Sequence, residues 1–185
     1  EILFKNLKIP IKVKKTKSFD FIEIVGNQNF KSFNYNIPSD ISSSAFFIVL
    51  TLLSKKSSLI IENVNVNPSR IGIIKILNKM GANIIFKNKK IYKGEPIADI
   101  FVKSSILLKP INCPEQLNSS AIDEFLLIFL IAAKCKGISY FKNLSELNQK
   151  ESPRLKLGSK ILNMIGIKTK LTNHSIKIYG QPNLK

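Results

Sequence analysis

An internal repeat is the feature that most constrains how this chain can fold. The segment Ile76–Gly81 (ILNKMG) is matched by Ile161–Gly166 (ILNMIG), at an offset of 85 residues (161 − 76 = 85). A weaker third copy begins at Ile2, at an offset of 74 residues (76 − 2 = 74). Because a short repeated unit buries its apolar face only against neighbouring units, we expect one partial and two nearly full copies of a single supersecondary unit.

Helix and strand signals follow the same order in both full copies: helix, strand, helix, strand, strand. In the first copy we expect a helix from Ser42 with three serines available as caps, a strand at 59–61, a helix capped by Asn67–Arg70 that runs to Met80, and strands at 82–86 and 97–102. In the second copy we expect a helix capped by Asn118–Ser120, a strand at 138–141, a helix from Ser152 or Pro153 to Gly166, and strands near 167–171 and 175–179. The partial copy contributes the end of a helix at 1–8 and strands at 10–14 and 19–25.

The first helix of each full copy is apolar on nearly every side, at 45–53 and at 125–133. A helix of this kind is expected to be buried all round. The second helix and the strands then lie outside it. The pattern therefore predicts an α/β fold that is inside out, with helices in the core and sheets as the wall. It also gathers helix N-termini, the positive ends of the helix dipoles, at one shared cleft.

Composition is that of a soluble globular protein, with 44% hydrophobic and 22% charged residues among 185. The longest apolar run, Phe125–Ala133, is far shorter than the ~20 residues that span a bilayer. The N-terminus has no signal-peptide pattern. Cys113 and Cys135 have no metal-ligand spacing and are expected to be buried, reduced thiols. These features favour a cytoplasmic protein that is not bound to a membrane. Because Glu1 already lies in an apolar-periodic segment, we expect the chain to be a piece of a longer protein.

The net charge of +17 raises the possibility of a basic nucleic-acid-binding module. The lysines are scattered along the whole chain, however, and the phenylalanines lie in apolar runs rather than between basic clusters. Binding that fell steeply with salt would favour this alternative. Arg70 and Arg154 are the only arginines in a lysine-rich sequence, which suggests positions where a planar, bidentate guanidinium is needed.

The segment 148–154 places Lys150, Glu151 and Arg154 where a loop becomes a helix. With Ser152 as the expected N-cap, the free N–H groups of the first turn attract phosphate or carboxylate, and the two cations reinforce them. A carboxylate in the same place is better explained if a proton is moved on or near the bound anion. A solvated charge cluster on a surface helix is the alternative.

Five blocks of sequence, in order, cover almost the whole chain: Ile37–Phe47, Asn67–Gly72, Gly94–Ile100, Ile122–Phe125 and Lys150–Leu155. Together they resemble the 5-enolpyruvylshikimate-3-phosphate synthase family, also called 3-phosphoshikimate 1-carboxyvinyltransferase. The resemblance implies two inside-out α/β domains of three units each that close over a cleft. Residues 1–38 would be the end of one domain, and residues 39–185 two of the three units of the other.

The resemblance also implies an activity. Family members transfer the enolpyruvyl group of phosphoenolpyruvate to the 5-hydroxyl of shikimate 3-phosphate and release phosphate, without a cofactor. We therefore expect these two small molecules as partners, no metal or nucleic acid, and a monomeric full-length protein. Several of the family's substrate-binding motifs fall outside residues 1–185, so the isolated chain is expected to be inactive.

Four residues match functional positions of the family motifs. By this resemblance, Asp123 binds the shikimate ring and accepts the hydroxyl proton, and Glu151 is the acid/base group at the enolpyruvyl carbon. Lys150 contacts shikimate 3-phosphate, and Arg154 contacts phosphoenolpyruvate. We expect Asp123 in the first turn of the buried helix, facing the cleft. Glu124 projects about 100° away from it and is expected to be structural.

The sequence departs from the family pattern at two positions, with Ser39 in place of glycine and Pro153 in place of an acidic or amide residue. The matching residues Arg70, Asp40 and Asp99 are interpreted as turn, cap and hinge residues, respectively. The related enzyme that transfers enolpyruvate to UDP-N-acetylglucosamine remains an alternative. It has a similar fold but lacks the Lys-Glu-Ser-x-Arg stretch, and its reactive cysteine loop would lie upstream of this chain.

Overall fold

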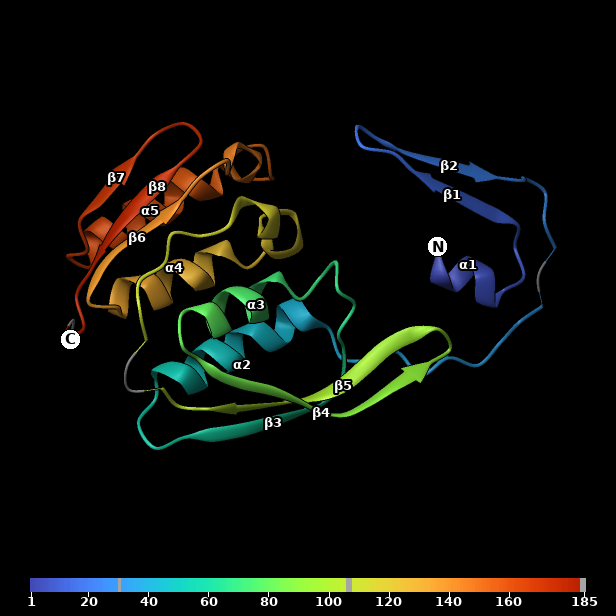
Figure 1. Ribbon diagram of the computed structural model, residues 1–185, viewed down its shortest axis with the longest axis horizontal. Helices are drawn as coiled ribbons and strands as arrows, with labels where there is room; N and C mark the ends of the chain where they lie inside the picture. The colour runs from blue at the N-terminus through green and yellow to red at the C-terminus, as the bar shows by residue number, and fades with distance from the viewer. Residues whose placement is uncertain (30, 106–107, 184–185) are drawn as a thin grey trace.

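The computed structural model describes residues 1–29, 31–105 and 108–183. The N-terminal part consists of a short helix, α1 (Ile2–Asn6), and an antiparallel hairpin of β1 (Ile11–Lys15) and β2 (Asp20–Ile24). Helix α1 contacts the turn between β4 and β5 of the first unit, where the Asn6 amide donates a hydrogen bond to Lys93 O. The hairpin stands apart, and an extended segment leads from it to the first unit (Figure 1). The order of helix, strand, strand in this N-terminal part is that of the last three elements of a full unit, as the weak third copy predicts.

Two full units follow, and both have the predicted order of elements. The first unit contains α2 (Ile41–Leu53), β3 (Ser58–Asn65), α3 (Gly72–Lys79), β4 (Asn83–Tyr92) and β5 (Glu95–Lys103). The second contains α4 (Phe125–Lys134), β6 (Gly137–Phe141), α5 (Arg154–Met164), β7 (Thr169–Leu171) and β8 (Ile176–Gly180). Single 3-10 turns, η1 (Glu115–Leu117) and η2 (Ser119–Ala121), precede α4, and η3 (Ser145–Asn148) precedes α5.

The two units also have the same sheet topology. Each forms a three-stranded antiparallel sheet in which the last strand is central, in the orders β3-β5-β4 and β6-β8-β7. The last two strands of each unit form a hairpin. Gly81 and Gly166, which end the second helices, have φ of +88° and +86°, a conformation that favours glycine after a helix. The repeat in the letters is therefore a repeat in structure.

Helices form the core and sheets cover it, as the sequence predicts. Helices α2, α3 and α4 lie between the two sheets (Figure 1). Phe125 and Phe129 of α4 pack on Phe141 of β6, with ring centroids 5.2 to 5.9 Å apart, and all three are buried. Aromatic side chains bury roughly 150–250 Å² each, so these three rings fix α4 against the sheet of its own unit.

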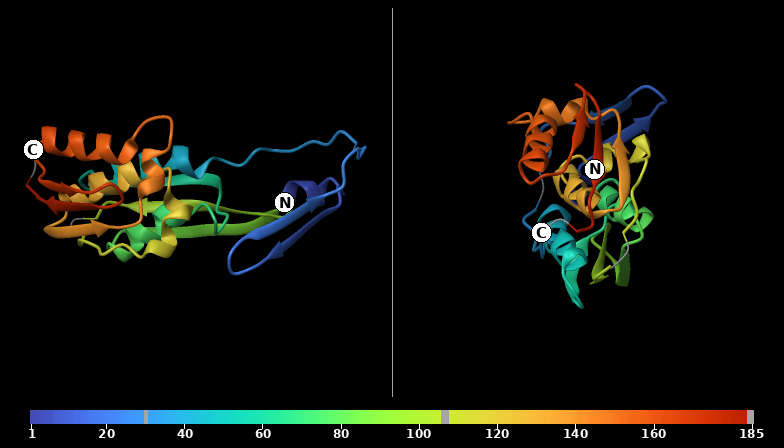
Figure 2. Two further views of the ribbon diagram at one scale, coloured as in Figure 1. Left: turned by 90° about the horizontal axis from the view of Figure 1, so that it is seen from above. Right: turned by 90° about the vertical axis from the view of Figure 1, so that its left-hand side faces the viewer.

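The prediction that α2 is buried all round is wrong. Phe46, Phe47 and Leu50 are 64%, 59% and 63% exposed, and Ile161 and Met164 of α5 are 52% and 76% exposed. Both views of Figure 2 place α2 and α5 toward the same side of the molecule. The two units pack against only one side of α2. The described residues therefore leave the apolar side chains on its other side exposed.

Helix starts also differ from the predictions. Helix α2 is capped by Asp40, whose carboxylate accepts a hydrogen bond from Ser43 N at 2.7 Å. The cap role expected of Asp40 is therefore confirmed, whereas the three serines do not cap the helix. Helix α3 begins only at Gly72, because Asn67 accepts a hydrogen bond from Ser69 N and closes a local turn. Asn118 does not cap α4. Its amide donates to two carbonyl groups in the loop after β6.

Gly72 is a point of close contact between the two units. A Cβ added there would lie 2.5 Å from the carbonyl carbon of Ser120 and 2.6 Å from the nitrogen of Ala121. Because backbone atoms cannot swing aside, we expect Gly72→Ala to lower the free energy of unfolding by about 1–3 kcal/mol in urea denaturation of a full-length protein containing this chain. Gly26→Ala is the control, since a Cβ there meets nothing within 4 Å. Equal stability of the two variants would contradict this packing.

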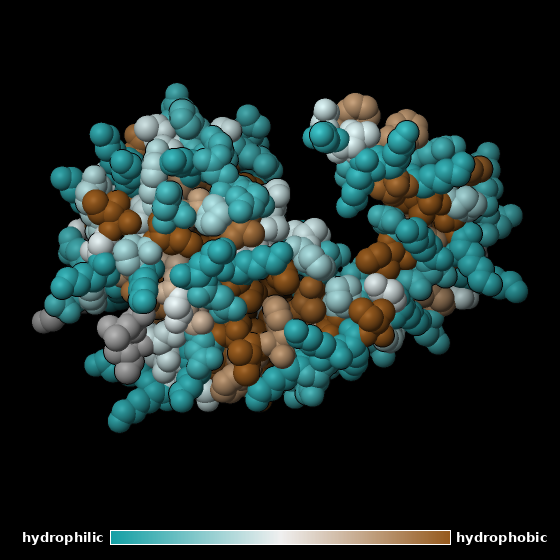
Figure 3. Space-filling view, viewed as in Figure 1, coloured by the Kyte–Doolittle hydropathy of each residue, from teal (hydrophilic) through white to brown (hydrophobic). Residues whose placement is uncertain are grey.

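Hydrophilic side chains are spread over the visible face of the body and of the N-terminal hairpin (Figure 3). Within residues 1–29, 31–105 and 108–183, no helix has the length and apolar character needed to cross a bilayer. In the same ranges no cluster of three or more His, Cys, Asp or Glu side chains could hold a metal ion. Cys113 and Cys135 are buried, as expected, and burial raises the pKa of each thiol to about 11.

Candidate active site

Asp123 lies in a turn between η2 and α4. The helix begins at Phe125, so Asp123 precedes it by two residues, and the prediction that it lies in the first turn is wrong. The reason is that the chain approaches α4 through successive tight turns, and Glu124 N still donates to Ala121 O rather than to a residue four positions back. The side chain of Asp123 is 37% exposed, which leaves its carboxylate accessible from the surface.

The loop before α5 carries the other three predicted residues. Pro153 is the N-cap, with ψ of 72°, and Arg154 is the first helical residue. The predictions that Ser152 is the N-cap and that Pro153 is the first helical residue are therefore both wrong. Because Pro153 is not in the helical conformation, the chain turns sharply at this point, and Arg154 N donates to Ser152 O at 2.7 Å.

This loop meets the turn before α4, so the four predicted residues come together. Arg154 Nη1 lies 3.2 Å from Asp123 Oδ1, and its Nη2 lies 2.9 Å from Glu151 Oε2. Lys150 Nζ lies 3.4 Å from the same oxygen of Asp123. Glu146, at 4.0 Å from Lys150, is a carboxylate at the edge that the sequence did not single out. We call Asp123, Lys150, Glu151 and Arg154 the charged cluster.

The members of the charged cluster differ in exposure and in ionisation. Lys150 and Arg154 are each 26% exposed, whereas Glu151 is 82% exposed. A hydrogen bond from its own backbone N–H, and then the Arg154 guanidinium, hold the pKa of Glu151 below its ordinary value. Glu151 is therefore an ionised carboxylate at neutral pH. An anionic ligand that binds Arg154 would compete with Glu151 for the guanidinium.

A second carboxylate, Glu124, lies beside Asp123 but points elsewhere. It is 4% exposed, and its Oε1 accepts a hydrogen bond from Ser42 Oγ at 2.5 Å. Ser42 Oγ in turn accepts a hydrogen bond from Arg70 Nη2 at 3.2 Å. Burial raises the pKa of Glu124 above its ordinary value. Arg70, Asp123 and Glu124 line one small cavity of about 20 Å³.

The sequence interpretation missed this arrangement because it placed Arg70 in a turn and gave Glu124 only a structural role. One signal could have found it. Arg70 and Arg154 are 84 residues apart (154 − 70 = 84), one less than the repeat offset of 85, so the two arginines lie within one position of each other in the two units. Each lies just before or at the start of a second helix and faces a carboxylate next to a first helix.

Two other motif residues, Asp99 and Ser39, have local contacts only, and the hinge role expected of Asp99 stays a prediction. Asp99 accepts hydrogen bonds from Asn63 N at 2.9 Å and from the Asn88 amide at 2.6 Å, within its own sheet. Ser39 pairs with β3 through its backbone, and its φ is not positive. Glycine is therefore not required at position 39, and this departure from the family pattern leaves the backbone unstrained.

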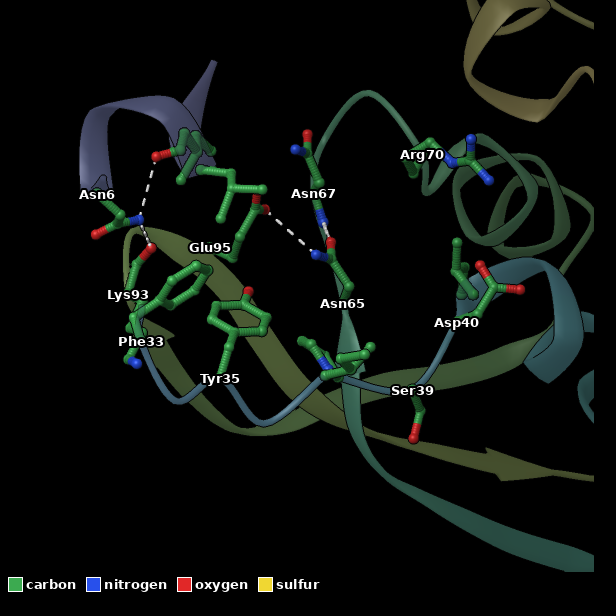
Figure 4. A pocket seen from close by; sticks show the side chains of 15 residues that line it. Asn6, Phe33, Tyr35, Ser39, Asp40, Asn65, Asn67, Arg70, Lys93 and Glu95 are labelled. Carbon is green, nitrogen blue, oxygen red and sulfur yellow. Dashed lines mark hydrogen bonds between the residues drawn. The ribbon is translucent and has the colours of Figure 1, made fainter. Parts of the chain in front are cut away.

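A larger cavity of about 720 Å³ lies between the N-terminal part and the first unit (Figure 4). Arg70 and Asp40 lie at one end, and Phe33, Tyr35 and Lys93 at the other. Pro38, where the sequence predicts a domain boundary, is one of the residues that line this cavity. Arg70 lines both this cavity and the small one next to Asp123, so the two spaces meet at its side chain.

Comparisons with known proteins show what the chain is similar to. The 3-phosphoshikimate 1-carboxyvinyltransferases of Ruthia magnifica subsp. Calyptogena magnifica and Staphylococcus aureus (strain JH9) are 39% and 35% identical over 97% of this chain. An EPSP synthase structure from Acinetobacter baumannii superposes with a TM-score of 0.87 at 37% identity, over 97% of this chain and 40% of that one. The enolpyruvyl transferase NikO from Streptomyces tendae, at 12% identity and a TM-score of 0.61, shares the fold.

The repeated units, with helices in the core and sheets outside them, have the α/β fold of the enolpyruvyl transferases. Residues 1–185 match the family described as EPSP synthase (3-phosphoshikimate 1-carboxyvinyltransferase). The chain belongs to that family. It spans about 40% of the length of the curated relatives it matches.

Proposed function

We propose that a full-length protein containing this chain transfers the enolpyruvyl group of phosphoenolpyruvate to the 5-hydroxyl of shikimate 3-phosphate and releases phosphate. The observation that carries the proposal is that Lys150 and Arg154 lie 3.4 Å and 3.2 Å from the same oxygen of Asp123, while Arg154 also lies 2.9 Å from Glu151. Two cations and two carboxylates in one place suit a reaction that brings two anions together and moves protons between them.

The four residues divide substrate binding and proton transfer between them. Asp123 accepts the proton of the 5-hydroxyl as its oxygen attacks the enolpyruvyl carbon. Glu151, which takes up a proton when phosphoenolpyruvate replaces it at Arg154, delivers that proton to the methylene carbon, which gives a tetrahedral intermediate. When phosphate leaves, Glu151 takes a proton back from the methyl group, and the proton held by Asp123 leaves with the phosphate. Lys150 holds shikimate 3-phosphate and Arg154 holds phosphoenolpyruvate, so both anions are fixed next to the carboxylates that act on them.

Substrate binding and proton transfer are coupled through Arg154. Its guanidinium contacts both Asp123 and Glu151, so an anion that binds Arg154 takes a positive partner away from each carboxylate. Loss of a cationic partner raises the affinity of a carboxylate for protons. Binding of phosphoenolpyruvate would thus turn Glu151 from a paired anion into a usable acid/base.

The domain organisation is also a proposal. We assign residues 1–38 to the end of one domain and residues 39–185 to two of the three units of a second domain. The extended segment around residue 38 and the isolated N-terminal hairpin support a boundary there (Figure 1). The exposed apolar faces of α2 and α5 support a missing third unit that covers them. We further propose a cytoplasmic monomer that needs no cofactor and has no nucleic-acid partner.

The test is phosphate release by the full-length protein from phosphoenolpyruvate, with different acceptors. We expect release that depends on shikimate 3-phosphate and no release with UDP-N-acetylglucosamine. Release with UDP-N-acetylglucosamine alone would instead establish the related transferase. Salt-dependent nucleic-acid binding without phosphate release would establish the basic binding module.

Arg154→Lys tests the binding half of the proposal. One guanidinium contacts Asp123 and Glu151 through different nitrogens, and a lysine ammonium cannot present two donors in the same plane. We expect the KM for phosphoenolpyruvate to rise roughly tenfold or more, because a charge-assisted hydrogen bond contributes about 1.5–3 kcal/mol. Steady-state kinetics with saturating shikimate 3-phosphate measure this, and an unchanged KM would remove Arg154 from the phosphoenolpyruvate site.

A further inference from the structure

The two adjacent carboxylates, Asp123 and Glu124, are held from opposite directions. Asp123 is bound by Arg154 and Lys150 of the second unit. Glu124 is bound through Ser42 to Arg70, both of the first unit. The turn that carries Asp123 is therefore fixed by two sets of contacts. Arg154 and Lys150 bind Asp123, and Ser42, which is 82 residues away in sequence, donates a hydrogen bond to Glu124.

The contact through Ser42 is stronger than an ordinary surface hydrogen bond. Glu124 is 4% exposed, and Ser42 lies in the first turn of α2. A hydroxyl that accepts from a guanidinium and donates to a buried carboxylate is part of a charge-assisted chain, and low local dielectric strengthens both links. If Ser42 is removed, a buried carboxylate loses the hydroxyl that bonds it, which is costly.

We propose that Glu124 is a positioning residue for the reaction: its contact with Ser42 and Arg70 fixes the turn before α4 and so sets where Asp123 lies. This inference rests on the proposed function, because it takes Asp123 as the group that accepts the hydroxyl proton. It assigns Glu124, Ser42 and Arg70 no contact with substrate. Misplacing a base by about 1 Å lowers turnover up to roughly a hundredfold, so small shifts of this turn have large effects.

Ser42→Ala is the principal variant, because it removes one oxygen and leaves the fold of α2 intact. We expect kcat of the full-length protein to fall roughly five- to tenfold, with an unchanged KM for phosphoenolpyruvate, since Arg154 is not part of this contact. Ser44→Ala is the matched control. Its hydroxyl is also buried in the first turns of α2 but donates only to Asp40 O, so its loss should leave kcat unchanged.

Glu124→Gln and Glu124→Ala separate geometry from charge. The amide oxygen of glutamine can still accept from Ser42, so Glu124→Gln should retain most of the activity, whereas Glu124→Ala should lower kcat at least as much as Ser42→Ala. If Glu124→Ala does not fold, the kcat of Ser42→Ala alone tests the positioning role. An unchanged kcat in folded Ser42→Ala protein overturns the positioning role.

The Asp123→Asn background distinguishes positioning from general loss of structure. The amide introduced by Asp123→Asn cannot act as a base, so its position no longer affects proton transfer. Ser42→Ala should therefore not reduce the residual turnover of Asp123→Asn further. An equal loss in both backgrounds means a purely structural role and overturns the inference. Wild-type turnover in Asp123→Asn itself would instead refute the role assigned to Asp123, and absence of phosphate release in the unmutated protein would refute the proposed function, so these failures are distinguishable.

Discussion

Replacing Glu151 by glutamine should lower kcat of the full-length protein by about 10²–10⁴-fold, the usual contribution of a general acid/base. The amide keeps the size and much of the hydrogen bonding of the carboxylate but cannot take up or release a proton. Because Glu151 is 82% exposed, the change should not affect folding. Both KM values should change by far less than kcat, since Lys150 and Arg154 remain to bind the two substrates.

Glu115→Gln is the control for this prediction. Glu115 is an exposed carboxylate in η1, before α4, and its side chain accepts a hydrogen bond from Asn143 rather than from the charged cluster. Its loss should leave turnover unchanged. If Glu151→Gln kept near-normal kcat while its melting temperature was unchanged, the acid/base role would have to belong to another residue.

The second large effect concerns the isolated chain of 185 residues, which should show no turnover at all. It contains the charged cluster, but by the family resemblance it lacks the other motifs that surround the two substrates. Catalysis at such a site depends on holding both substrates and on surrounding the developing charge. The exposed faces of α2 and α5 should also make it associate, because Phe46, Leu50 and Met164 are each more than 60% exposed.

Phosphate release by the purified chain, incubated with both substrates, measures the first expectation, and sedimentation velocity measures the second. The same chain with Glu151→Gln provides the background. Sustained release above that background would mean that residues 1–185 hold a complete site, and a stable monodisperse monomer would mean that the exposed faces of α2 and α5 need no cover.

The order of the elements could be predicted from the sequence because local signals determine it. Apolar periodicity marks the helices, and Gly81 and Gly166 end the second helix of each unit with positive φ. The repeat then places equivalent elements in equivalent sheets. Three members of the charged cluster were found from the residue pattern, because they lie in one short loop, whereas Asp123 was found only through the family resemblance.

What the sequence could not give are the contacts between units. The bond from Ser42 to Glu124 joins residues 82 positions apart, and no local pattern encodes it. The start of α4 at Phe125 depends on how the turns before it pack against Gly72 of the other unit. The exposure of Phe46 and Phe47 likewise depends on which neighbours are present, whereas hydrophobicity alone predicts burial.

A crystal structure of the full-length Glu151→Gln protein with shikimate 3-phosphate and phosphoenolpyruvate would test the central claim most directly. The account predicts the shikimate ring against Asp123, its phosphate at Lys150, and phosphoenolpyruvate at Arg154, with the guanidinium released from Asp123. Both substrates bound instead in the cavity beside Tyr35 and Lys93, with the ion pairs of Arg154 intact, would contradict it.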